Sequence, residues 1–321
     1  MIGQDSPRRL RILVWNVHGN YLHALTQLPH DWIIPVEGGR NGYTPPTPAL
    51  DWPDGLHLTA PSALRDEALD LVVYQSRDNL ADAAELLTRA QRSLPSIYIE
   101  HNTPEPHPTD SWHPFRHPRG LLVHVTHYNA VMWLSPGMPA RVIEHGLPDP
   151  GPLQTGELPR GITVVNHIER RGRRLGLDLY ERARQRLSLD LIGMGSEHLP
   201  GGLGEVPGRD VSRLVGRYRY LFSPIRYTSL GLSIVQAMLC GVPVVGFAAT
   251  ELASLISNGE DGFVDTQEQA WLDAALRLER DPVMARTWGA NARRKALARF
   301  GMARFAADWN AAFNTVLEDT C

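Results

Sequence analysis

The sequence predicts an α/β fold made of two parallel-sheet domains, and three observations support this prediction. Residues 220–246 follow a strand, helix, strand pattern. Short continuous apolar runs, which are typical of strands buried on both faces, recur through both halves of the chain. A stretch rich in proline and glycine, residues 148–159, separates the two halves and has the composition of a linker.

The clearest unit is the stretch YLFSPIRYTSLGLSIVQAMLCGVPVVG at 220–246. Its first apolar run stops at Pro224, since proline cannot extend a strand interior. Gly241 and Pro243 end the following helix before the next strand begins. One side of that helix is expected to carry Leu232, Val235, Gln236 and Leu239, which lie three or four positions apart.

The turn before this helix predicts a phosphate site. Residues 228–231 read TSLG and stand where the first backbone N–H groups of the helix lack intrahelical partners. Such groups attract an anion, and a glycine lets a phosphate come close. Many turns of this kind bind nothing, so the pattern alone leaves both possibilities open.

Elements of the first domain alternate along residues 11–150. The expected strands cover 11–17, 32–36, 69–75, 97–101 and 121–126, and the expected helices cover 20–28, 78–94 and 127–134. Residues 38–61 are expected to form a long loop. A proline-broken segment at 101–120 is expected to be a mobile loop whose Trp112, His113 and Arg116 face a ligand.

The second domain repeats the alternation after the linker. Its expected strands cover 161–166, 189–195, 220–222 and 242–245, and its expected helices cover 210–218, 267–280 and 282–300. A last helix, at about 302–317, is expected to return to the first domain.

Composition excludes several classes of function. A net charge of −3 gives no reason to expect a nucleic-acid partner, and 43% hydrophobic with 21% charged residues is typical of a soluble globular protein. The apolar run near the N-terminus is too short for a signal sequence or a membrane span. Two cysteines, and four histidines (His101, His107, His113 and His117) without zinc-site spacing, predict no metal site.

The stretch 228–245 resembles the signature of retaining GT-B glycosyltransferases, in particular family 4, whose pattern is close to E-G-F-G-L-x-x-x-E-A-M-A-x-G-x-P-V-V. The matching residues are Gly231, Leu232, Ala237, Met238, Gly241, Pro243, Val244 and Val245. Thr228 and Gln236 stand where the family has glutamates. The resemblance is strong over 161–300 and weak over 1–150.

This resemblance implies a GT-B fold, with two Rossmann-like domains and a cleft between them. Residues 1–150, with the C-terminal helix at about 302–321 packed back on them, would form the acceptor side. Residues 151–301 would bind the nucleotide sugar. The implied activity moves a sugar from a nucleotide-sugar donor to an acceptor hydroxyl with retention of configuration, with no bound metal and no cofactor beyond that donor.

The resemblance also implies the site residues. His101 and Arg171 are the expected catalytic residues, Arg171 being the counterpart of a family lysine that holds the diphosphate. The expected donor-binding residues are Gly19, His167, Thr228, Ser229, Leu230, Gly231, Leu232 and Gln236. His167 replaces a family arginine, and residues 205–209 stand where the family contacts the nucleotide base.

Three functions remain open at this stage. The first is a retaining glycosyltransferase, acting on a glycan, a lipid-linked acceptor or a small molecule. The second is a GT-B-like sugar- or nucleotide-binding subunit with weak or no activity, which Thr228 and Gln236 favour. The third is another nucleotide-binding enzyme such as an epimerase. A cytoplasmic location is predicted, and peripheral attachment to the inner face of the membrane stays open.

Overall fold

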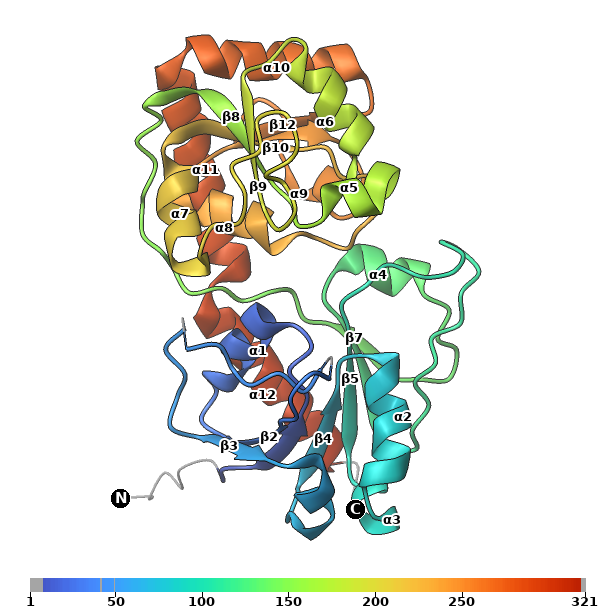
Figure 1. Ribbon diagram of the computed structural model, residues 1–321. Coiled ribbons are helices and arrows are strands. Elements are labelled where there is room, and N and C mark those ends of the chain that lie inside the picture. The colour runs from blue at the N-terminus through green and yellow to red at the C-terminus, as the bar shows by residue number, and fades with distance from the viewer. Residues whose placement is uncertain (1–7, 41, 49, 319–321) are drawn as a thin grey trace, which may run out of the picture. The chain divides into compact units, whose positions relative to one another are not determined.

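The computed structural model describes residues 8–40, 42–48 and 50–318. The chain divides into two compact units (Figure 1). Unit 1 comprises Met1–Gly146 and Met302–Cys321, and unit 2 comprises Leu147–Gly301. The chain therefore leaves unit 1 at residue 146 and returns to it at residue 302.

Unit 1 is built on a seven-stranded parallel sheet with the order β3-β2-β1-β4-β5-β6-β7. Its strands are β1 (Arg11–Val14), β2 (Asp31–Pro35), β3 (Leu56–Thr59), β4 (Leu71–Tyr74), β5 (Ser96–Glu100), β6 (Gly120–His124) and β7 (Ala140–Val142). The order from β3 to β6 is that of a doubly wound nucleotide-binding sheet. The central strands are buried on both faces, because helices cover each side.

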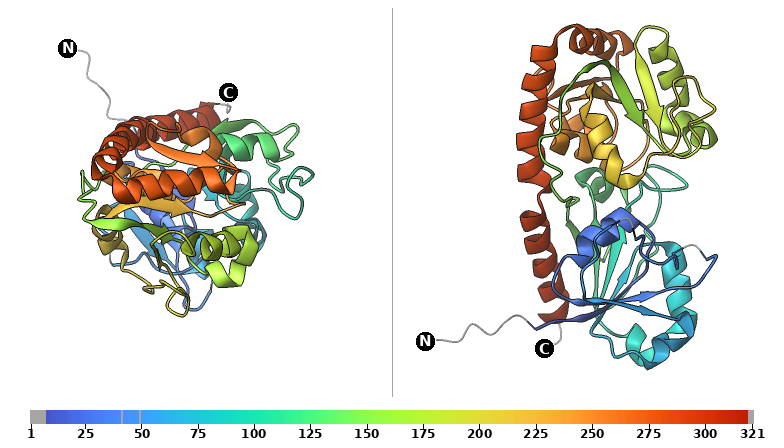
Figure 2. Two further views of the ribbon diagram at one scale, coloured as in Figure 1. Left: turned by 90° about the horizontal axis from the view of Figure 1, so that it is seen from above. Right: turned by 60° about the vertical axis from the view of Figure 1, so that its left-hand side comes forward.

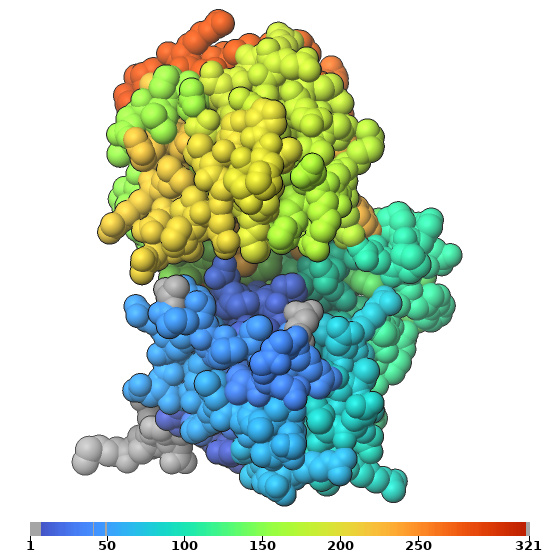
Figure 3. Space-filling view, viewed as in Figure 1, coloured from blue at the N-terminus to red at the C-terminus, as the bar shows by residue number. Residues whose placement is uncertain are grey.

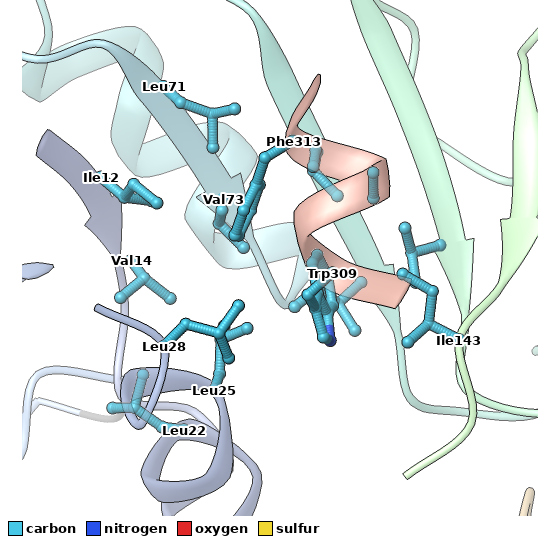
Figure 4. Close-up of a cluster of buried hydrophobic side chains, with 14 of the residues drawn as sticks. Ile12, Val14, Leu22, Leu25, Leu28, Leu71, Val73, Ile143, Trp309 and Phe313 are labelled. Carbon is cyan, nitrogen blue, oxygen red and sulfur yellow. The ribbon is translucent and has the colours of Figure 1, made fainter. Parts of the chain in front are cut away.

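Helices of unit 1 take opposite faces of this sheet. The helical elements are α1 (Gly19–Thr26), η1 (Pro61–Asp66), α2 (Arg77–Leu86), α3 (Arg89–Arg92), α4 (His127–Met132) and α12 (Met302–Glu318). One face carries Ile12, Val14 and the side chains of α1 and α12 (Figure 4). Leu13 and Trp15 point to the other face, against α2 and η1, because strand side chains alternate. The last helix, α12, lies along the sheet of unit 1 (Figure 2).

Unit 2 contains a five-stranded parallel sheet with the order β12-β11-β10-β8-β9. Its strands are β8 (Leu158–Val164), β9 (Leu189–Ile192), β10 (Tyr218–Ser223), β11 (Val244–Phe247) and β12 (Gly262–Asp265). Two hydrophobic clusters cover its two faces: one contains α7 and α8, and the other contains α6 and α10.

The helices of unit 2 follow the expected alternation. They are α5 (Ile168–Arg171), η2 (Gly172–Leu175), α6 (Leu177–Arg184), α7 (Gly208–Gly216), α8 (Leu232–Cys240), α9 (Leu252–Leu255), α10 (Glu268–Arg280) and α11 (Pro282–Phe300). The predicted α/β class is thus confirmed, with a parallel sheet and helices in each unit. None of the helices in the described residues is long and apolar enough to span a membrane.

Three local predictions were wrong in unit 1. The expected helix at 78–94 is two helices, because Leu87 is extended and Thr88 begins a new helix with a capping box to Gln91. The expected loop at 38–61 contains the edge strand β3, which pairs with β2. The third concerns His113 and is described with the site below.

Candidate functional site

Each sheet has one point where the direction of strand addition reverses. In unit 2 this switch lies between β8 and β10: the chain adds β9 on one side of β8 and then β10 to β12 on the other. In unit 1 the switch lies between β1 and β4. Ligands of open parallel sheets bind outside the carboxyl ends of the strands at such points. The segments after β8 and β10 therefore form the first candidate site.

The helix after β10 presents an open amino end. Gly231 is the N-cap of α8, and no side chain caps this end of the helix. The helix is held beside β8, since the Ser233 hydroxyl donates to the carbonyl of Val164 at 3.3 Å. The first N–H groups of α8 and its dipole thus supply positive potential at the switch point.

The segment after β8 contains a strained residue. His167 has φ 53° and ψ 40°, in the left-handed region, and begins α5. Its N–H donates to the carbonyl of Met194 at 2.8 Å, which ties it to the turn after β9. Gly193 makes that approach possible, because a Cβ there would lie 2.3 Å from the carbonyl oxygen of Val165. His167 is thus fixed by neighbouring backbone rather than by its own preference.

Thr250 is the second strained residue of this unit. It follows β11 and has φ 50°, which is rare for a β-branched side chain. Its hydroxyl donates to the carbonyl of Ser229 at 3.3 Å. Among the described non-glycine residues, His167 and Thr250 alone have positive φ. Both follow sheet strands at their carboxyl ends, where strain is associated with function.

Arg171 ends α5 and is exposed. Its guanidinium makes no hydrogen bond or ion pair with another described residue. Partial burial, and then the adjacent Arg170, lower the pKa of Arg171, although an arginine stays charged at neutral pH. The short helices α5 and η2 lie at the surface of unit 2 with α6 (Figure 3). Arg171 is therefore a cation that the fold leaves available for an anion.

A bidentate ion pair fixes the loop that follows β10. The two terminal nitrogens of Arg226 lie 2.5 and 2.8 Å from the carboxylate oxygens of Asp178, in the first turn of α6. The loop also packs on Gly176, where a Cβ would lie 1.9 Å from the carbonyl oxygen of Pro224. These contacts join the segments after β8 and β10, which carry the predicted phosphate ligands.

Replacing Asp178 with asparagine is expected to lower the free energy of unfolding at pH 7 by about 1–2 kcal/mol, a range that allows for solvent screening. Hydrogen bonds from Arg226 lower the pKa of Asp178 to about 2. Because the folded-state pKa is depressed, this stabilisation is present above the unfolded value of 3.8 and is lost as pH falls through about 2.

Urea unfolding of wild type and the Asp178→Asn variant between pH 2 and 7 would measure this difference. Asp66→Asn is the control, because Asp66 is exposed and makes no ion pair with a described residue. A gap between wild type and variant that stays constant across this range would contradict the assignment.

The remaining predicted residues of unit 2 lie along the same segment. Thr228 is half-buried, and Ser229 and Leu230 are buried before the N-cap. Gln236 lies one turn into α8, where its amide nitrogen donates to the Ser212 hydroxyl of α7 at 2.7 Å. His167, Arg171 and the 228–232 segment thus all follow β8 or β10, the two strands of the switch point in unit 2. Their contacts with a donor remain predictions.

In unit 1 the predicted residues Gly19 and His101 also lie at strand carboxyl ends. Gly19 is the first residue of α1, after β1, and His101 follows β5. The rings of His101 and His18, the N-cap of α1, have centroids 4.2 Å apart. The imidazole Nε2 of His101 lies 2.9 Å from the Gln75 amide oxygen. Unit 1 therefore forms a second polar group at its own switch point.

Burial controls the charge of this group. His101 is 9% exposed, and the Tyr21 ring packs edge-on against it at 4.6 Å between centroids. Desolvation by burial, followed by repulsion from His18 and His145, lowers the pKa of His101 well below its usual value. Burial also lowers the pKa of His18. Both imidazoles are thus neutral at physiological pH.

The prediction that His113 faces a ligand was wrong. His113 is 1% exposed, and its Nε2 lies 3.0 Å from a carboxylate oxygen of the buried Glu100. Its ring packs against Tyr98, with centroids 4.6 Å apart. Trp112 is exposed, and Arg116 donates to the carbonyl of His113. His113 therefore holds the 101–120 segment onto the core instead of pointing outward.

Sequence reasoning missed the contacts of Gln75, the backbone strain at Thr250 and the Asp178–Arg226 pair. Gln75 carried a signal, because it is the polar residue at the end of the apolar run LDLVVYQ. The other two carried none, since backbone strain and a pairing across 48 positions appear only in three dimensions. Within the described part of the chain, no group of three or more His, Cys, Asp or Glu side chains is placed to hold a metal ion.

Residues 179–281 match the family model described as "Glycosyl transferases group 1". Two curated relatives match over shorter stretches. The lipopolysaccharide core biosynthesis mannosyltransferase LpcC of Rhizobium leguminosarum bv. viciae is 32% identical over 136 residues, which is 42% of this chain and 38% of that protein. The N-acetyl-alpha-D-glucosaminyl L-malate synthase of Bacillus anthracis is 30% identical over 95 residues, which is 28% of this chain and 24% of that protein. The chain thus spans well under half the length of these relatives.

Solved structures match almost the whole chain. Sucrose-phosphate synthase from Thermosynechococcus elongatus has a TM-score of 0.71 at 14% identity, covering 97% of this chain and 100% of that one. Anabaena HepE, in complex with UDP-glucose, has a TM-score of 0.68 at 14% identity, covering 96% and 100%. At this identity the likeness shows the fold, which is GT-B.

Proposed function

We propose that the protein is a glycosyltransferase that moves a sugar from a nucleotide-sugar donor to an acceptor hydroxyl, with retention of configuration and without a bound metal. One observation carries the proposal: the uncapped amino end of α8 and Arg171, which has no hydrogen-bond or ion-pair partner among the described residues, follow the two strands of the switch point in unit 2. The match of residues 179–281 to the group 1 family supports it.

In this proposal unit 2 stabilises the leaving diphosphate. The bond between the anomeric carbon and the β-phosphate oxygen breaks, while the acceptor oxygen bonds to that carbon on the same face. The acceptor proton leaves with the nucleoside diphosphate. Negative charge develops on the phosphate, and the amides of 230–232 and the Arg171 guanidinium are the groups that offset it. An arginine fork can hold two phosphate oxygens at once.

The sugar and ribose contacts complete the proposal. We assign His101 and Thr228 to the sugar and Gln236 to the ribose hydroxyls. His167 and Gly19 are assigned to the donor phosphates or the acceptor. Gln236 can serve the ribose through its amide oxygen, because its nitrogen already donates to Ser212. The relatives act on sugars, and HepE binds UDP-glucose in its crystal, which supports a nucleotide sugar as donor.

A panel of nucleotide sugars, incubated with the protein and a mixture of glycan, lipid-linked and small hydroxylated acceptors, tests this function. We expect release of nucleoside diphosphate with one donor, unchanged by EDTA, and a product whose anomeric proton coupling matches that of the donor. An inverted anomer would overturn retention, and loss of turnover in EDTA would overturn metal independence.

A second candidate is a sugar- or nucleotide-binding subunit without turnover. It is favoured by Thr228 and Gln236, which replace two family carboxylates with uncharged groups. Hydrogen bonds to a charged acceptor are about twice as strong as neutral ones. A nucleotide at 100 times its Kd would still raise the free energy of unfolding by about 2.7 kcal/mol. Thermal stabilisation by nucleotides, with no diphosphate released from any donor, would identify this function.

A further inference from the structure

A pocket of about 220 Å³ lies at the β9 edge of the sheet in unit 2, between α6 and the turn that follows β9 (Figure 1). Its apolar walls are Leu177 and Tyr180 of α6 and Leu199 and Pro200 of the turn. All of its lining residues fall within 177–185 or 199–200, so the pocket is separate from the segments assigned to the donor. Pockets for drug-sized ligands measure about 300–1,000 Å³, so this pocket fits a molecule smaller than a nucleotide sugar.

Hydrogen bonds hold the walls of the pocket in place. The Tyr180 hydroxyl donates to the carbonyl of Pro200 at 2.9 Å, which joins α6 to the turn. Burial raises the pKa of Tyr180 to about 12, so the hydroxyl keeps the proton that it donates. The Leu191 N–H of β9 donates to the carbonyl of Gly201 at 2.8 Å, and the Leu203 N–H donates to the carbonyl of Leu191 at 2.8 Å. The pocket is therefore formed before any ligand enters.

Arg184, in the last turn of α6, brings a positive charge to the pocket. The half-buried guanidinium makes no hydrogen bond or ion pair with another described residue, and its Nε is buried. It lies against the backbone of Gly201, where a Cβ would lie 2.9 Å from Cζ of Arg184. A buried N–H without a partner is unusual in a native protein. The N–H groups of Arg184 thus indicate an acceptor that comes from outside the chain.

The other polar residues at the mouth of the pocket limit the charge of its ligand. Glu181 of α6 and Gln185, the C-cap of that helix, are both exposed. Glu181 lies three positions before Arg184, but the two side chains form no ion pair in the described structure. A guanidinium fork matches the two oxygens of a carboxylate. A second negative charge on the ligand would be repelled by Glu181, which disfavours a phosphate monoester.

We propose that this pocket binds a small molecule with one carboxylate and an apolar body. The carboxylate pairs with the guanidinium of Arg184, and the apolar part packs against Tyr180 and Leu199, which removes apolar surface from water. The pocket is a second ligand site of unit 2, and its assignment does not depend on the proposed function.

The test uses phenylacetate, a monocarboxylate with an apolar ring, at pH 7.5. The alcohol 2-phenylethanol has the same carbon skeleton without a charge, and phenyl phosphate carries nearly two negative charges at this pH. Backbone amide spectra of isotope-labelled protein would locate and measure binding. Arg184→Gln removes the charge from the pocket. Arg286→Gln is the matched control, because Arg286 is an exposed arginine of α11 in the same unit that does not line the pocket.

With wild type, we expect phenylacetate to cause saturable shifts of amides in α6 and residues 199–203. The alcohol and phenyl phosphate should bind at least about tenfold more weakly. Arg184→Gln should raise the Kd for phenylacetate about tenfold or more, since hydrogen bonds between two charged groups are lost. Arg286→Gln should leave this Kd unchanged. Glu181→Gln should strengthen the binding of phenyl phosphate, because it removes the repelling carboxylate.

Two results in wild type would overturn the proposal, even if Arg184→Gln failed to fold. The first is a lack of saturation by about 10 mM phenylacetate, which is weak even for a ligand of this size. The second is equal affinity for phenylacetate and either of the other two probes. A folded Arg184→Gln that keeps the wild-type Kd would also overturn it, as would shifts confined to residues 228–232, because these would place the anion at the donor site. None of these measurements uses a nucleotide sugar, so the proposed function can fail while this site stands.

Discussion

The Arg171→Ala variant is expected to lose about 10²–10³-fold in kcat/KM for the nucleotide-sugar donor, the range seen when one group that stabilises developing charge is removed. Arg171 lies one short helix after β8, at the switch point of unit 2. The pyrophosphoryl leaving group gains charge as its bond to the sugar breaks. A guanidinium beside the leaving group stabilises this developing charge more in the transition state than in the bound substrate. Removing it should therefore lower kcat as well as kcat/KM.

The fold itself should tolerate this change. The Arg171 guanidinium makes no hydrogen bond or ion pair within the described chain, so the free energy of unfolding should move by less than about 0.5 kcal/mol. Arg171→Lys should retain part of the activity, because a lysine keeps the charge but cannot grip two oxygens as a fork.

Arg286→Ala is the control for net charge. Arg286 is an exposed residue of α11 in the same unit, it has no ion pair with a described residue, and it does not belong to the segments at the switch point. Steady-state kinetics of Arg171→Ala, Arg171→Lys and Arg286→Ala with the active donor would measure the loss of kcat/KM in each variant. Equal kcat/KM for Arg171→Ala and Arg286→Ala would remove Arg171 from the site.

The class of fold could be predicted from the sequence, because the patterns that indicate strands and helices each lie within a short run of residues. The strands in the run LDLVVYQ and in the stretch 220–246 can be recognised from their consecutive apolar residues, because a strand that is buried on both faces is apolar throughout. The edge strand β3 was not predicted, because it reads LHLT and its middle residues His57 and Leu58 are both exposed. An edge strand with little burial has no apolar pattern to detect.

The places of the candidate site residues in the fold could be predicted for the same reason. Helix starts and glycine turns depend on a few consecutive residues, so the sequence alone could predict that His167, Arg171 and residues 228–232 follow strands of the second sheet. These strands are β8 and β10, on either side of the switch point of unit 2. The bond between Gln75 and His101 joins residues 26 positions apart, and no local rule pairs them. The same holds for His113, whose burial depends on a carboxylate 13 positions earlier. Such pairings follow from strand order, which the sequence alone did not determine.

The second large effect concerns stability. Trp309→Ala is expected to lower the free energy of unfolding by about 3–5 kcal/mol, the usual cost of removing a buried tryptophan side chain. Trp309 is 0% exposed in α12, its ring packs against those of Phe305 and Phe313, and it belongs to the buried cluster that also contains side chains of β1, β4, β5 and β6 (Figure 4). No neighbouring side chain can fill the space of an indole, because interiors are packed close to crystalline density.

Trp112→Ala is the matched control, because Trp112 belongs to the same unit but is 61% exposed, and its loss should cost less than about 0.5 kcal/mol. Urea unfolding would compare the two variants, and hydrogen exchange would place the loss on the amides of β1 and β4. If both variants were equally stable, α12 would not be part of the core of unit 1.

If Trp309→Ala is destabilised as expected, the last seventeen-residue helix supports the strands whose carboxyl ends position Gln75 and Gly19. Changes in this distant helix would then reduce activity through the stability of the unit that holds His101.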